Sequence, residues 1–185
     1  VTCGDLDVDR AWAFPSGALS TNLTGLGGSL PSDQVIVRGG VSTLVLGVTG
    51  PCGAEAERNG WLVSDPLRSV EDALAGRDET IDRVVVLTHR VGEAVGSIAR
   101  LDGVDVVIEA DGYAARYPPV VASGRAVWVR TWRDAERLGE LRLRWDATGR
   151  LVSAQDGAIG LAPRLRGTRW VEQLVDEVAT SDGPG

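Results

Sequence analysis

The chain has 185 residues, of which 43% are apolar and 24% charged, so it is long enough for one globular domain with a sizeable core. Its net charge of −7 and its lack of a basic stripe exclude nucleic acid as a natural partner, because phosphates are neutralised by clustered basic side chains. No run approaches the ~18 apolar residues of a membrane-spanning helix.

The chain contains no methionine, even at position 1, and no signal peptide. We therefore expect it to begin inside a longer gene product, whose lost piece would have carried any export signal. On this basis we expect an exported protein, periplasmic or extracellular, from a bacterium.

The first predicted elements follow a turn-rich opening segment, residues 3–25. Residues 34–38 and 42–48 are rich in apolar, β-branched side chains, which predicts two strands. The dipeptide Gly39-Gly40 between them is typical of a tight hairpin turn.

The middle of the chain alternates helical and strand patterns. A helix is predicted over 65–76, where Asp65 is the N-cap, Pro66 lies in the first turn and Gly76 closes the helix. The elements that follow are a strand over 83–88, helical spacing over 91–101 and a strand over 104–109. This order favours an α/β fold with parallel strands.

The last third changes character. Residues 125–132 and 137–155 alternate apolar and polar side chains, which predicts an antiparallel meander with a turn at 146–149. We place a domain over residues 1–162. An amphipathic helix is predicted over 163–180, and a disordered tail over 181–185.

His89, the only histidine, follows the apolar run 84–87. Strand ends often carry metal ligands in enzymes, so His89 is either a working ligand, the remnant of one, or a histidine hydrogen-bonded in a polar cleft.

Four stretches, taken in order, carry a resemblance to a known family. They are "GDLDVD" (4–9), "ALSTNLTG" (18–25), "VVVLTHRVG" (84–92) and "VDVVIEADGYA" (104–114). From residue 3 to about 155 the chain resembles the catalytic domain of calcineurin-like metallophosphoesterases, in the bacterial 5′-nucleotidase branch. The resemblance implies two packed mixed β-sheets flanked by helices, a four-layer sandwich that here lacks its amino-terminal part. In that fold, loops after the strands hold two metal ions that clamp a phosphoryl group.

The metal-binding positions are degenerate in this chain. Asp5 and Leu6 stand where the family has the asparagine and the histidine of Gly-Asn-His-Glu, and leucine cannot act as the general acid. Asp111 and Tyr113 replace the two histidines of Gly-Gly-His-Ser-His, so only His89 is unchanged. We therefore expect no cofactor. A divalent Mn, Zn or Fe ion on Asp5, His89 and Asp111 is the alternative.

The two cysteines, Cys3 and Cys52, would close a loop of about 50 residues as a disulfide, worth roughly 4 kcal/mol in the chain-entropy model. The resemblance implies that both lie at the sheet edge near the degenerate site. A Cys2His metal site with His89 and unpaired cysteines are the alternatives.

Three functions remain open at this point. We favour a non-catalytic domain that acts as a structural or interaction module of a larger exported protein or complex. Its partner would be an upstream segment of the same gene product or another subunit. The first alternative is an active metal-dependent phosphomonoester hydrolase completed by upstream ligands. The second is a binding module for an electron-transfer partner.

Overall fold

The computed structural model describes residues 19–25, 28–52, 57–58, 60–110, 120–122, 126–131 and 137–160. All structural statements below concern this part of the chain. The predicted domain end at residue 162, the helix over 163–180 and the tail over 181–185 lie outside it. Among the described residues, no helix combines the length and the apolar character needed to cross a lipid bilayer.

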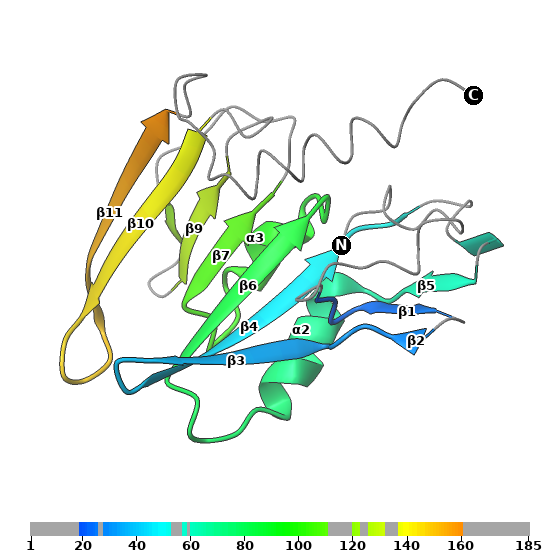
Figure 1. Cartoon of the computed structure of the whole chain (residues 1–185), viewed down its shortest axis with the longest axis horizontal. Coiled ribbons are helices and arrows are strands. Elements are labelled where there is room, and N and C mark those ends of the chain that lie inside the picture. Colours follow the sequence, from blue (N-terminus) through cyan, green and yellow to red (C-terminus); the bar gives the residue numbers. More distant parts are fainter. Residues whose placement is uncertain are drawn as a thin grey trace, which may run out of the picture.

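A six-stranded mixed sheet forms the centre of the structure (Figure 1). Its strands, in spatial order, are β3 (Asp33–Arg38), β4 (Val41–Thr49), β6 (Arg83–His89), β7 (Val106–Glu109), β9 (Ala126–Arg130) and β8 (Val120–Ala122). The four inner strands β4, β6, β7 and β9 run parallel, whereas β3 and β8 pair antiparallel at the two edges. The predicted parallel pairing of the middle strands is therefore confirmed, although strands predominate over helices among the described residues.

The predicted hairpin of β3 and β4 is also confirmed. Gly39 and Gly40 both have positive φ, 57° and 80°, which is the backbone of the primed turns that suit two-residue hairpins. Glycine adopts this conformation without steric cost.

Two helices connect the parallel strands. Helix α2 (Pro66–Ala75) begins as predicted, because the Asp65 carboxylate accepts a hydrogen bond from the Arg68 N–H at 2.8 Å. Helix α3 (Ala94–Ile98) is shorter than the predicted 91–101. Gly92 has a φ of 60°, so the right-handed helix starts only after this residue.

The core lies between the sheet and these helices, which pack against one face. Its fully buried members, with 0–1% of their surface exposed, are Leu46, Val70, Val84, Val86, Ile98, Ala99, Val104, Val107 and Ala126. Leu87, on the opposite face, is 39% exposed. The structure thus shows one mixed sheet with a helical layer on one face. The described residues do not show the expected helix-flanked four-layer sandwich.

Two smaller sheets accompany the central one. The first contains β2 (Gly28–Ser29), β1 (Leu23–Gly25) and β5 (Trp61–Val63), and it encloses a small core of Leu23 and Trp61. The second is a hairpin of β10 (Arg137–Trp145) and β11 (Leu151–Gly160), which pair only with each other among the described strands.

The prediction of one antiparallel meander over the last third is wrong for its first strand. β9 pairs parallel with β7 in the central sheet, separately from the hairpin. Val127 of β9 is fully buried, as expected for a strand covered on both faces. The alternation predicted for 137–155 is confirmed over 141–145, where Leu141, Leu143 and Trp145 are half-buried while Arg142 and Arg144 are exposed.

A half-buried carboxylate, Asp105, lies just before β7. Its Oδ2 atom accepts a hydrogen bond from the Val84 N–H at 2.8 Å. Burial raises the pKa of Asp105 above its ordinary value of 3.8, and it outweighs the Val84 hydrogen bond and the Arg83 and Arg77 charges, which lower it.

This raised pKa predicts a pH-dependent effect of Asp105→Asn. The folded chain holds the Asp105 proton more tightly than the unfolded chain, so the ionised group lowers stability at neutral pH. That loss is recovered as the pH falls through the raised pKa toward the ordinary one. Asparagine still accepts the Val84 hydrogen bond without a charge.

The variant's advantage in unfolding free energy should therefore shrink as the pH falls from neutral to about 4. Denaturant unfolding of both proteins across this range measures the difference. A difference that is constant or grows on acidification would contradict the assignment.

Candidate functional site

The carboxyl ends of the parallel strands meet at one edge of the central sheet. β4, β6, β7 and β9 end there at Thr49, His89, Glu109 and Arg130. Open parallel sheets bind their ligands at this edge, so it is the candidate site of this domain.

His89 is the last residue of β6, as its position after the apolar run predicts. It lies opposite Thr49 in the register between β4 and β6, and its carbonyl accepts a hydrogen bond from the Gly50 N–H at 2.8 Å. The side chain is partly buried and its Nδ1 atom is enclosed. The structure therefore places His89 at the site edge, while its role as a metal ligand stays a prediction.

A tight turn follows His89. Arg90 has a φ of 54°, which is uncommon for a residue other than glycine, and Gly92 has a φ of 60°. The backbone of Gly50 approaches this turn so closely that a Cβ atom at position 50 would overlap the carbonyl group of Arg90. The backbones of the loops after β4 and β6 are thus in direct contact, with no room for a side chain at position 50.

Asn22 fixes the neighbouring loop. It is only 2% exposed, and its Nδ2 donates hydrogen bonds to the carbonyls of Thr49 at 2.7 Å and Ser64 at 2.9 Å. Its Oδ1 accepts one from the Thr49 N–H at 2.9 Å. Both amide donors and the acceptor are therefore used on backbone groups, which is a structural role.

Glu109, at the site edge, forms an ion pair that balances its negative charge. Its side chain is 5% exposed, and its Oε2 accepts hydrogen bonds from Arg130 Nε at 2.6 Å and from Trp128 Nε1 at 2.9 Å. Arg130 also lies over the Trp128 ring, 5.4 Å from its centroid. These three residues come from β7 and β9 and lie on the helix-covered face, together with the core residue Val107.

This ion pair was not predicted from the sequence. The available signal was an acidic residue at the end of the apolar run 106–108, because a buried carboxylate needs a charged or hydrogen-bonding partner. The partner, 21 residues along the chain, could not be recognised before the pairing of β7 with β9 was known.

The site edge is consequently not acidic among its described residues. The charge of Glu109 is balanced there by the guanidinium group of Arg130, and the exposed residue Arg90 follows β6 directly in the chain. The described residues bring no group of three or more His, Cys, Asp or Glu side chains together as a metal-binding set. On its own, this part of the edge offers one imidazole and backbone groups.

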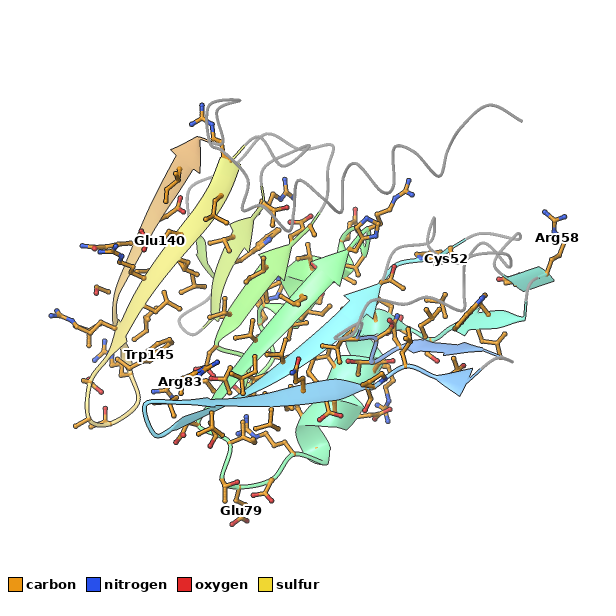
Figure 2. The ribbon with its side chains drawn as sticks, in the orientation of Figure 1. Cys52, Arg58, Glu79, Arg83, Glu140 and Trp145 are labelled. Carbon is orange, nitrogen blue, oxygen red and sulfur yellow. The ribbon has the colours of Figure 1, made fainter. Side chains whose placement is uncertain are left out.

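Several predicted site residues lie outside the described part of the chain: Cys3, Asp5, Asp111 and Tyr113. Cys52 is described and follows β4 at the site edge (Figure 2), where it packs against the small core of Leu23 and Trp61. Its Sγ lies 3.7 Å from the Gly50 carbonyl. The pairing of Cys3 with Cys52 stays a prediction.

The close approach at position 50 predicts that Gly50→Ala destabilises the fold. Either loop must move to admit the methyl group, at a cost of about 1–3 kcal/mol in unfolding free energy. The matched control is Gly139→Ala, because a Cβ atom there meets no atom within 4 Å. Denaturant unfolding should show a loss for the first variant and a change within ~0.5 kcal/mol for the second. Equal effects would contradict the backbone fit.

The buried ion pair predicts a second destabilising change. Glu109→Ala removes the carboxylate to which both Arg130, whose side chain is 21% exposed, and the Trp128 Nε1–H are bonded. We expect a loss of about 3–5 kcal/mol in unfolding free energy. Replacing both residues with methionine should recover part of this loss, because the charge of Arg130 is removed as well, while the Trp128 Nε1–H still loses its acceptor. If the double variant is as unstable as the single one, the ion pair is not the cause.

Comparison with known proteins supports the fold. No protein-family profile matches the chain, and a search among curated proteins finds no match. Among the matching solved structures, sulfate thiohydrolase SoxB from Thermus thermophilus has a TM-score of 0.71 and 20% identity, covering 89% of this chain and 32% of that one. A 5′-nucleotidase precursor, also from Thermus thermophilus, has a TM-score of 0.62 and 22% identity, covering 88% and 38%. NAD nucleotidase NadN from Haemophilus influenzae has a TM-score of 0.59 and 12% identity, covering 88% and 40%.

The chain therefore spans between 32% and 40% of the length of these three structures. Identities of 12% to 22% establish a common fold and leave the chemistry of this chain to its own residues. The expected likeness to 5′-nucleotidases is confirmed at this level: the chain shares the fold of part of SoxB, the 5′-nucleotidase precursor and NadN.

Proposed function

We propose that this chain is a metallophosphoesterase-like domain that has lost its dinuclear metal chemistry and acts as a structural or interaction module of a larger exported protein or complex. The matched part of the similar structures would be their catalytic domain. The observation that carries the proposal is the ion pair of Glu109 with Arg130 at the carboxyl edge of the sheet.

The charge of this edge is the physical reason. Two divalent cations require several anionic or neutral oxygen and nitrogen ligands, whose combined negative charge offsets the charge of the metals. Here the described carboxylate is already bound to a guanidinium at 2.6 Å. A metal ion that used Glu109 as a ligand would have to displace this positive charge.

The sequence adds a chemical argument. Leu6 stands where the resemblance expects the general acid, a role worth roughly 10²–10⁴-fold in rate. Asp111 and Tyr113 stand at two histidine positions. An aspartate can bind a hard cation, but a neutral tyrosine at this position is a poor substitute for an imidazole. Phosphate ester hydrolysis would lack both its acid and part of its metal set.

Exposed apolar side chains support a role in assembly. Leu87 lies on the face opposite the helices with 39% of its surface exposed, and the edge strand β3 exposes Val35 and Val37 by 49% and 61%. Such surfaces are typical of sites that another chain or segment covers. We propose an upstream segment of the same gene product, or another subunit, as that partner.

The alternative is a metal-dependent phosphomonoester hydrolase in which Asp5, His89 and Asp111 bind Mn, Zn or Fe together with upstream ligands. The position of His89 at the carboxyl edge of β6 favours it. In that case the histidine would be the best-preserved ligand, and its loss would abolish metal binding.

Elemental analysis and a phosphomonoesterase assay in added manganese or zinc separate the two when they are made on the chain alone and on the chain together with the upstream segment or partner subunit that the alternative requires. We expect well under one metal ion per chain and no hydrolysis, with His89→Ala indistinguishable from the parent in both measurements. About two bound metals per chain, with hydrolysis that His89→Ala abolishes, would overturn the proposal.

A further inference from the structure

The hairpin of β10 and β11 has no strand neighbours among the described residues except its own two strands. It stands beside the central sheet as a separate ribbon (Figure 1). Two-stranded hairpins are marginally stable in water on their own, so this ribbon depends on contacts with the remainder of the protein. The nature of these contacts decides how firmly the hairpin is held.

The turn end of the hairpin does not pack closely against the sheet. A cavity of about 680 Å³ lies between the loop Gly103 to Asp105 before β7 and the hairpin residues Thr148 to Ala154, which are the turn and the start of β11. This cavity lies near the amino-terminal ends of the parallel strands, at the opposite end of the central sheet from the candidate site. The hairpin can therefore move here without first displacing a tightly packed core.

A cation–π contact bridges the hairpin and the sheet beside this cavity. The Arg83 guanidinium, at the start of β6, lies 4.5 Å from the centroid of the Trp145 ring, at the end of β10 (Figure 2). The Arg83 Nη1 also donates a hydrogen bond of 2.7 Å to the carbonyl of Asp82. The cation is thus positioned by the sheet and the ring by the hairpin.

An irregularity in the hairpin lies at the same point. The pairing of β10 with β11 shifts register between Arg144 and Trp145. Bulges of this kind bend a strand locally and change the direction of a side chain. Here the change falls on the residue that contacts Arg83, whereas the regular ladder runs from Arg137 to Arg144.

From these observations we propose that the hairpin is a latched arm, and that the contact between Arg83 and Trp145 is its latch. When the contact opens, the hairpin moves away from the sheet as a unit. The movement exposes the apolar side of β10, formed by Leu141, Leu143 and Trp145, and widens the cavity above Asp105. The central sheet and its helical layer stay folded, because their core contains no hairpin residue.

Hydrogen exchange followed by mass spectrometry tests this latch with Arg83→Met, which removes the cation and keeps much of the side-chain length. Removing a contact of this type should shift the opening equilibrium by about 2- to 30-fold. We expect exchange of amides in 137–145 and 151–160 to accelerate by that factor, with unchanged protection in β4 and β6. The control is Arg142→Met, which removes a guanidinium from the exposed side of the same strand, where it pairs with Glu140.

Trp145→Leu removes the latch from the hairpin side and must reproduce the Arg83→Met result. Unchanged exchange of the hairpin in both variants would overturn the proposal. Equal acceleration in the hairpin and the sheet would also overturn it, because the hairpin would then open only with the whole domain. Arg83→Lys keeps the cation and should restore part of the protection.

Discussion

The buried amide of Asn22 holds the small sheet and the central sheet together. It binds the backbone of Thr49, at the end of β4, and the carbonyl of Ser64, just after β5. Thr49 lies 27 residues away from Asn22 along the chain and Ser64 lies 42 away. One side chain therefore joins its own segment to two distant ones. A buried amide that loses a hydrogen-bond partner costs free energy, so separating any of these segments from Asn22 would destabilise the fold.

The hydrogen bonds of Asn22 also determine the positions of the loops at the candidate site. Once Asn22 fixes the end of β4, the hydrogen bond from Gly50 to His89 fixes the end of β6, and the turn at Arg90 follows. The imidazole is thus placed by backbone contacts. The fold is held by amide and carbonyl groups that every residue possesses.

Local signals in the sequence predicted the elements that depend on local chemistry. The hairpin at Gly39-Gly40 and the N-cap at Asp65 follow from turn and capping residues, and both are confirmed. The end of β6 at His89 follows from an apolar run. The alternation of β10 follows from its own period of two. In each case the residues that determine the structure lie within a few positions of one another.

Features that depend on distant partners could not be predicted in this way. β9 was assigned to a meander because its pairing with β7 is invisible in its own sequence. The Glu109 to Arg130 ion pair depends on that same pairing. The helix after β6 is shorter than its apolar spacing predicts because Gly92 adopts a left-handed backbone, which glycine permits without requiring it. The candidate site concentrates such long-range features, so its neighbourhood was the least accessible to sequence analysis.

The exposed edge strand β3 affects the tendency of the protein to aggregate. All six of its residues are exposed, and three consecutive ones, Val35 to Val37, are apolar and β-branched. A ribbon of this kind can template the addition of another strand when chains are crowded, during synthesis or concentration. Only the charged residues at its two ends, Asp33 and Arg38, oppose such stacking. Selection for solubility would therefore act on these two positions more strongly than their lack of any role in the core suggests.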